Sequence, residues 1–211
     1  MSREKPYSSI VAHYEDCLSR FGDTHLGVDW QNADDAYKRY QIMLDIIKPE
    51  ASKITLLDFG CGTAGLLDYI NEKKILYIDY SGLEISTEFF NVSKKKYPNN
   101  TFFNMDILDK DALLPCFDYI IMNGVFTEKI DLSHNIMFSY FCSMIETIYP
   151  HCRKGIAFNL RSKQVMAEDQ DLFHLSLDEL AWFLVEKFGR NFIIRNDYGL
   201  EEYAVYICKE P

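Results

Sequence analysis

The sequence predicts an α/β protein built on a doubly wound, mostly parallel sheet of seven strands with an antiparallel last strand. Short apolar runs alternate with amphipathic helical segments from residue 53 onward, the pattern of parallel strands joined by helices. A glycine-rich stretch, LLDFGCGTAGLL, follows the first run. The runs at 191–198 and 202–209 are separated by only three residues. Parallel strands need a crossover of about a dozen residues, so this final pair is antiparallel.

Turn and capping residues set the order of the elements. The loop FGDTHLGVDWQNADD interrupts the helical pattern of the first fifty residues, and Asn32 or Asp34 can cap the helix that follows. Ser86 can cap the helix after the second strand, and Gly189 can end the last helix. We expect strands over 53–60, 80–85, 101–108, 117–124, 154–160, 191–198 and 202–209. We expect helices over 65–73, 87–97, 137–152 and 176–189.

The chain divides into residues 1–52, expected to form an N-terminal helical lid, and residues 53–211, expected to form the sheet domain. A length of 211 residues suffices for one well-buried core with a small appendage. The first residues, MSREKPYSSIVAHYED, lack the apolar core of a signal peptide. Six scattered cysteines without a C-x-x-C pair are typical of reduced thiols. These features predict a cytoplasmic protein without a metal site.

The net negative charge of the chain indicates which classes of partner it can bind. A formal net charge of −10 repels a phosphate backbone unless a local basic patch overrides it. The short basic run Lys94-Lys95-Lys96 falls on a predicted helix, where a solvated face is the simpler interpretation. Charged residues interrupt the apolar runs, so no membrane span is predicted. We therefore expect a small-molecule partner, with no nucleic acid and no membrane, and the oligomeric state stays open.

A glycine loop follows the first predicted strand. Gly60, Gly62 and Gly65 form a G-x-G-x-x-G pattern that allows a tight turn and lets the backbone approach a nucleotide. Proteins that bind NAD, FAD or S-adenosylmethionine (SAM) all use such a loop, so the pattern alone leaves the cofactor open. Asp58 stands two residues before the first glycine and favours SAM. The alternative is that its carboxylate only binds loop amides.

Two acidic residues compete for the ribose-binding position at the tip of the second strand. Glu84 stands two residues before the helix cap Ser86, which places it at the carboxyl end of the strand. Asp79 is nearer the spacing of about 20 residues from Gly60 that is expected of an NAD-binding acid. Five further residues precede the helix, however, so Asp79 falls at the entrance of the strand. The helix context favours Glu84, with Asp79 as the alternative.

Four segments resemble the ordered motifs of class I SAM-dependent methyltransferases, over residues 53–209. Asp58 with the glycine loop resembles motif I, and Glu84 in GLEIS resembles motif II. Asp106 resembles the motif III acid that accepts from the adenine amino group, and the chain leaves the fourth strand at Asn123 as in motif IV. The resemblance implies a Rossmann-like fold and SAM as cofactor. It implies cofactor contacts from Asp58, Gly60, Cys61, Gly62, Glu84, Ile85, Met105, Asp106, Ile107, Asn123 and Gly124.

The sequence also narrows the methyl acceptor. Methyl transfer is an in-line displacement, so positioning and water exclusion carry most of the catalysis. The chain lacks the [D/N]-P-P-[Y/F] motif of enzymes that methylate amino groups of DNA bases. Pro115-Cys116 precedes the fourth strand, whereas cytosine-5 enzymes place that dipeptide after it. No carboxylates cluster at the tip of the fourth strand as in metal-dependent catechol-type enzymes. A small-molecule acceptor is expected, with O-methylation favoured over N-methylation.

The N-terminal and C-terminal segments resemble small bacterial methyltransferases of capsule and O-antigen biosynthesis, among them enzymes that methylate a capsular phosphoramidate. By this resemblance Trp30 covers the cofactor and Arg39 pairs with its carboxylate; the alternatives are core packing and a surface ion pair. An anionic phosphate-type acceptor would need no base, but it would need cations. His174 is the candidate base, with a structural role as the alternative. We expect substrate contacts from Tyr14, Phe126, Lys129, Arg161 and Tyr198.

Two other functions stay open at this point. One is an NAD-dependent oxidoreductase on the same glycine loop, and the other is a non-catalytic SAM-binding accessory protein. The antiparallel C-terminal pair, the position of Asp58 and the N-terminal extension count against the oxidoreductase. The absence of an obvious base favours the accessory protein, which a turnover assay would separate from an enzyme.

Overall fold

The computed structural model describes residues 5–50 and 52–209. One sheet runs in the order β3-β2-β1-β4-β5-β8-β7, and β6 pairs with β5 off this path. Among the described strands, only β8 runs against its two neighbours, β5 and β7, so the predicted Rossmann-like sheet with an antiparallel last strand is confirmed. The strands are β1 (Ile54–Phe59), β2 (Ile78–Glu84), β3 (Thr101–Asn104), β4 (Phe117–Met122), β5 (Cys152–Ser162), β6 (His174–Leu175), β7 (Phe192–Arg195) and β8 (Glu202–Cys208).

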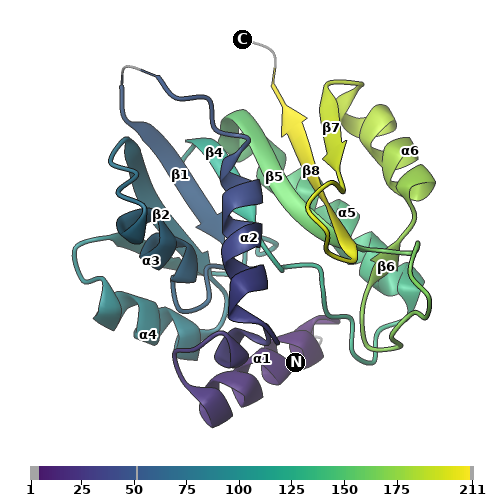
Figure 1. Cartoon of the computed structure of the whole chain (residues 1–211), viewed down its shortest axis with the longest axis horizontal. Coiled ribbons are helices and arrows are strands. Elements are labelled where there is room, and N and C mark those ends of the chain that lie inside the picture. The colour runs from purple at the N-terminus through teal and green to yellow at the C-terminus, as the bar shows by residue number, and fades with distance from the viewer. Residues whose placement is uncertain (1–4, 51, 210–211) are drawn as a thin grey trace.

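Helices flank this sheet (Figure 1), and α1 lies below the carboxyl ends of the parallel strands in that view. The N-terminal elements are α1 (Ser8–Phe21), the 3-10 turn η1 (Leu26–Val28) and α2 (Ala33–Leu44). The remaining helices are α3 (Gly65–Glu72), α4 (Thr87–Lys96), α5 (His134–Ile148), the 3-10 turn η2 (Tyr149–His151) and α6 (Leu177–Phe188).

The sheet carries a hydrophobic core on each face. Side chains alternate between the two faces of a strand, and β1 shows this directly. Leu57 and Phe59 pack into one core together with α5 and α6, whereas Ile54 and Leu56 pack into the other with α2 and α3. A strand buried on both faces reads as a continuous apolar run, which is why β1 and β4 were predictable from hydrophobicity alone.

The predicted caps are confirmed, but several strand bounds differ from expectation: β5 is longer than the predicted 154–160, and β7 is shorter than the predicted 191–198. The Asn32 side chain accepts the Asp34 N–H at 2.9 Å, and the Ser86 hydroxyl accepts the Phe89 N–H at 3.4 Å. The third strand ends at Asn104 instead of residue 108, so the segment 105–107 lies in a loop beyond the sheet. The two-residue β6 was not predicted, because so short a strand leaves no periodicity.

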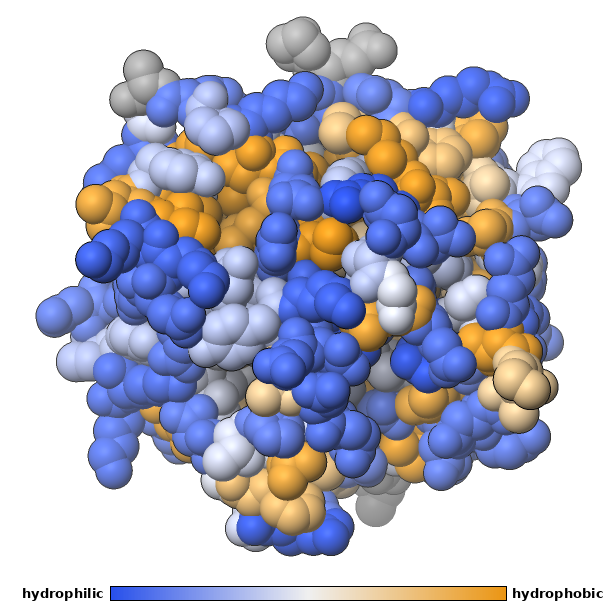
Figure 2. Space-filling model, in the orientation of Figure 1, coloured by the Kyte–Doolittle hydropathy of each residue, from blue (hydrophilic) through white to orange (hydrophobic). Residues whose placement is uncertain are grey.

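The face of the molecule in Figure 2 is mostly hydrophilic, and its larger hydrophobic areas lie in the upper part, away from α1. Within the described ranges, no helix is long and apolar enough to cross a membrane.

Candidate active site

A cavity lies at the carboxyl ends of β1, β2 and β4, between the sheet and the N-terminal helices. The order of strands reverses between β1 and β4, and open α/β sheets bind ligands at such a switch point. The sequence-predicted residues that line this cavity are Tyr14, Trp30, Asp58, Gly60, Cys61, Gly62, Glu84, Ile85, Met105, Asp106, Ile107, Asn123 and Gly124. The described chain therefore gathers the four motifs into one concave surface.

The glycine loop takes the sharp turn that its sequence predicts. Gly60 and Gly62 have φ values of 70° and 53°, in the left-handed region that disfavours residues with a Cβ. The N–H groups of Gly60 and Cys61 both donate to the Leu83 carbonyl, at 2.8 and 3.1 Å. The loop is thereby fixed to the end of β2, and its backbone forms one side of the cavity.

Glu84 ends β2 and reaches the glycine loop. Its two carboxylate oxygens accept the N–H groups of Gly62 at 2.9 Å and Ser86 at 3.0 Å. Burial raises the pKa of Glu84, and these backbone bonds oppose that rise. A carboxylate offers about four lone-pair sites, so two stay available to ribose hydroxyls. Asp79, the alternative acid, is exposed near the start of β2 and does not line the cavity.

Asp58 is the penultimate residue of β1, just before the glycine loop, and is almost fully buried. The Tyr80 hydroxyl donates to its carboxylate at 2.8 Å. Burial is the main reason that its pKa is raised to about 7; the Tyr80 hydrogen bond opposes the shift and the Glu84 charge adds to it. A nearby cation, such as the ammonium of a methionine moiety, would return this carboxyl to its ionised form.

Asp106 follows β3 and is held by the N-terminal segment. Lys5 and Tyr7 both bond one of its oxygens, and the Leu108 N–H donates to the other at 2.9 Å. Burial alone would raise the pKa of Asp106, but the bonds from Lys5 and Tyr7 lower it. The Tyr7 ring also stacks on Tyr140, with centroids 4.7 Å apart. The motif III acid thus anchors the first described residues to the sheet.

Asn123 offers a buried acceptor to a ligand. Its Oδ1 atom is buried and has no hydrogen-bond partner in the described part of the chain, although the residue lines the cavity. An orphaned buried acceptor costs about 1–3 kcal/mol. A ligand that carries an N–H donor, such as the ammonium of SAM, would satisfy it. Together with Glu84 and the glycine loop, this atom fits SAM.

Trp30 closes the cavity over the end of β4. A Cβ atom at Gly124 would lie 2.7 Å from the Trp30 ring, so only glycine permits this approach. The Arg39 guanidinium lies over the same ring, 4.1 Å from its centroid. Arg39 is also paired with buried Glu202, with an N–O distance of 2.9 Å, and does not line the cavity. The predicted pairing of Arg39 with the cofactor carboxylate is therefore replaced by this internal ion pair.

The Glu202 carboxylate connects that ion pair to the cavity wall. It accepts from Asn159 Nδ2 at 3.2 Å and from the Tyr198 hydroxyl at 3.3 Å. Asn159 Oδ1 in turn accepts the Gly124 N–H at 2.7 Å. A buried network thus joins α2, β5 and β8 to the backbone at the end of β4. Through Asn159, this network holds the Gly124 backbone in place.

Tyr14 is the predicted substrate residue that reaches the cavity, where its hydroxyl donates to the Gly124 carbonyl at 3.3 Å. The other predicted substrate residues do not line it. Phe126 is fully buried among the aromatic rings of the core, and Tyr198 is buried against Glu202. The Lys129 amine donates to the Gln170 carbonyl, and Arg161 pairs with Glu201 at 3.4 Å. These four residues therefore lie outside the cavity, contrary to the prediction.

His174 is buried and serves the structure of β6. Its Nδ1 lies 2.6 Å from the Ser162 carbonyl, and its Nε2 accepts the Asp169 N–H at 3.3 Å. Both ring nitrogens are therefore engaged with backbone groups, and the residue does not line the cavity. The predicted role as catalytic base is corrected: the histidine fixes the loop between β5 and β6.

Several residues of the site carried no sequence signal. Tyr7, Tyr40 and Tyr140 line the cavity, and nothing in their surroundings resembles a motif. Glu128 is outside the cavity lining and only 7% exposed, and its pKa is raised to about 7, mainly by burial and next by the charge of Asp29. A single acid in a loop gives no indication of such burial.

The segment that carries these motifs is similar to known proteins. A family model described as a methyltransferase domain matches residues 57–137, which span the glycine loop, Glu84, Asp106 and Asn123. The candidate methyltransferase Rv1506c of Mycobacterium tuberculosis is 22% identical over 164 residues, which cover 75% of this chain and 95% of that protein.

Solved structures share the whole fold. The magnesium protoporphyrin IX methyltransferase of Synechocystis PCC 6803, with bound S-adenosylhomocysteine (SAH), superposes with a TM-score of 0.64 at 13% identity. The alignment covers 96% of this chain and 99% of that one. A TehB-like SAM-dependent methyltransferase of Corynebacterium glutamicum gives a TM-score of 0.57 at 15% identity, over 94% and 100% of the two chains. The plantazolicin methyltransferase BpumL, with a substrate analogue and SAH, gives 0.58 at 15% identity, over 96% and 98%.

Proposed function

We propose that this chain, a SAM-dependent methyltransferase, transfers the methyl group from the SAM sulfonium to a hydroxyl oxygen of a small, uncharged acceptor. The sulfur–methyl bond breaks as the oxygen–methyl bond forms, S-adenosylhomocysteine leaves, and the hydroxyl proton is released to solvent. SAM supplies an electrophilic methyl group on a sulfonium. The carboxylates of Asp58 and Glu84 attract and orient the cationic cofactor, and the side chains of Tyr14 and Trp30 exclude water from the end of β4. The methyltransferase-domain match and the antiparallel last strand argue against the NAD-dependent alternative.

The charge of the residues that line the cavity supports an uncharged acceptor. Asp58, Glu84 and Asp106 line it, whereas no lysine, arginine or histidine is found among the described residues that line it. Such a wall suits a cationic cofactor and repels an anionic acceptor. A saccharide precursor of a surface polysaccharide is the hydroxyl compound that we favour, supported by the resemblance of the N-terminal segment to capsule and O-antigen methyltransferases.

One observation keeps a phosphate-type or phosphoramidate-type oxygen as the second candidate. Arg161 lies near the carboxyl end of β5, and its buried Nε has no partner in the described chain. An anionic oxygen could receive this donor, and it would need no base. Under this alternative Arg161→Met would abolish transfer, whereas under the hydroxyl proposal it would lower activity by less than about threefold, as for a residue outside the cavity.

The test is transfer of isotopically labelled methyl from SAM to matched acceptors. One set consists of neutral sugars and nucleotide sugars with free hydroxyls, and the other of their phosphate and phosphoramidate counterparts. Porphyrin and plantazolicin acceptors, named for the structural neighbours, serve as further comparisons. Label on a hydroxyl supports the proposal, and label only on a phosphate-type oxygen overturns it. SAM binding without transfer to any acceptor would favour the accessory-protein alternative.

A further inference from the structure

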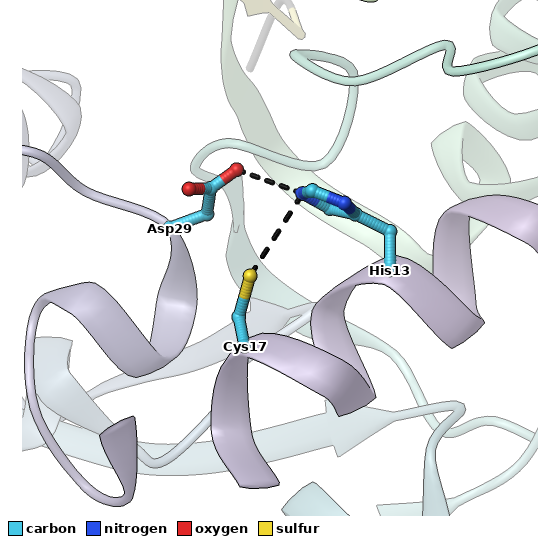
Figure 3. Close-up of side chains that lie close together, drawn as sticks. All are labelled: His13, Cys17 and Asp29. Atoms are coloured by element: carbon cyan, nitrogen blue, oxygen red, sulfur yellow. Dashed lines mark hydrogen bonds and ion pairs between the residues drawn. The ribbon is translucent and has the colours of Figure 1, made fainter. Parts of the chain in front are cut away.

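Three side chains that can bind a metal meet beside the N-terminal helices. His13 and Cys17 lie one turn apart on α1, so their side chains share a face of the helix. Asp29 follows η1 in a left-handed conformation, with φ of 57°. Figure 3 shows the three side chains converging, and their ligand atoms all lie within 4.8 Å of one another. Across residues 5–50 and 52–209, no second group of three such side chains meets this condition.

The separations of the ligand atoms fit a tetrahedral ion. With bonds of about 2.3 Å to sulfur and about 2.0–2.1 Å to nitrogen and oxygen, a tetrahedral zinc ion holds its ligand atoms roughly 3.3–3.6 Å apart. His13 Nε2 lies 2.8 Å from Asp29 Oδ2 and 3.9 Å from Cys17 Sγ. These values bracket the tetrahedral range, so small side-chain rotations would bring all three atoms into position.

The donor set selects the class of ion. A thiolate, a neutral imidazole and a carboxylate suit zinc and chemically similar transition ions, whereas calcium and magnesium prefer oxygen atoms alone. Ionised Cys17 and Asp29 would supply two negative charges, which match a divalent ion. The partly exposed His13 and Asp29 side chains, 32% and 23%, leave the cluster open to solvent.

We propose that His13, Cys17 and Asp29 bind a divalent ion of the zinc class, which joins α1 to the loop before α2. The neighbours of these ligands, Tyr14 and the pair Val28 and Trp30, line the cavity. The ion would therefore fix the part of the N-terminal segment that covers the cofactor. With three protein ligands, its fourth position stays open to water.

Cobalt(II) titration of the full chain tests this proposal independently of methyl transfer. One equivalent of cobalt should produce the near-ultraviolet charge-transfer band of a thiolate–cobalt bond together with the visible bands of a tetrahedral ion. Zinc should displace the cobalt and remove both. The titration uses a phosphine reductant, because a thiol reductant would compete for the metal. A wild-type chain that gives no thiolate band at one equivalent overturns the proposal without any variant.

Variants assign the site. Cys17→Ser should remove the thiolate band and weaken metal binding by at least about 100-fold, while Cys142→Ser on α5 should keep both. His13→Gln, at a partly exposed position, should weaken binding to a similar degree and keep the fold, so the test does not depend on buried Cys17 alone. A band that survives Cys17→Ser, or that disappears in Cys142→Ser, places the metal elsewhere and overturns the proposal.

Discussion

The two walls of the cavity are held in different ways. The sheet wall, residues 58–62, 84–86 and 105–107, is fixed by backbone bonds such as those from Gly60 and Cys61 to the Leu83 carbonyl. The N-terminal wall, residues 7–14 and 28–30, is fixed by side chains that meet across long stretches of chain. Its main ties are the bond of Tyr7 to Asp106 and the contact of the Trp30 ring with Arg39, which is itself paired with Glu202. A wall tied by a few side chains should open when one is removed, whereas the sheet wall should not.

The largest effect is expected from the buried ion pair of the N-terminal wall. Arg39→Met leaves the Glu202 carboxylate buried and uncompensated, and we expect the free energy of unfolding to fall by about 3–5 kcal/mol. Urea denaturation measures this change. Arg20→Met, which removes an exposed pair with Asp16, is the control and should cost less than about 1 kcal/mol. Equal losses in the two variants would show that the buried pair does not hold the wall.

The next effect concerns the sheet wall and is measured as a loss of cofactor affinity. Glu84→Ala removes the carboxylate that would bond the ribose, and two charged hydrogen bonds are worth about 3 kcal/mol or more. SAM affinity measured by calorimetry should therefore fall by about 100-fold. Asp79→Ala, on the exposed start of β2, should leave it within about twofold. A larger loss of SAM affinity in Asp79→Ala than in Glu84→Ala would mean that Asp79, and not Glu84, contacts the ribose.

A smaller effect separates the two walls at Asp106. Tyr7→Phe removes one hydrogen bond to a buried carboxylate, which should lower the free energy of unfolding by about 1.5 kcal/mol. Tyr37→Phe makes the same chemical change at an exposed bond to Glu72 and should leave the free energy of unfolding nearly unchanged. If both substitutions cost the same, Tyr7 does not tie the N-terminal segment to the sheet.

The same contrast explains what the sequence could predict. Asp58, Gly60, Gly62 and Glu84 are found from local spacing, because strand ends, turns and caps are set by neighbouring residues. The partner of Arg39 is Glu202, 163 residues away, and no local pattern indicates which charged residue will meet it.

The residues that were predicted to contact the acceptor, but lie outside the cavity, show the same limit of local patterns. Phe126 was predicted from its place in a motif, His174 from its place before a helix, and Tyr198 from the C-terminal segment. Each side chain instead points into a core, a loop or the buried network of Glu202. The direction of a side chain depends on packing between elements, which chain order does not record. For the same reason, the sequence did not indicate that Asp29 lies close to His13 and Cys17, across the turn between two helices.

The smallest expected effect is a pH dependence of the sheet wall. Burial raises the pKa of Asp58 to about 7, so from pH 8 to pH 6 its ionised fraction falls about tenfold and SAM affinity should fall by up to about tenfold, because the uncharged acid attracts the SAM ammonium less. Calorimetry across this range measures it, and Asp58→Asn should bind more weakly at pH 8 with a flatter profile.

The same group has the opposite effect on folding. Its pKa lies near 7 in the folded chain and at its ordinary 3.8 when unfolded, so between these values the unfolded chain has released a proton that the folded chain still holds. Stability should therefore fall as pH rises from about 4 to about 7, whereas SAM affinity rises as the pH passes 7. The buried Glu84 shifts in the same direction. Affinity that stays flat while stability follows this slope would mean that Asp58 is buried as described but does not contact the cofactor.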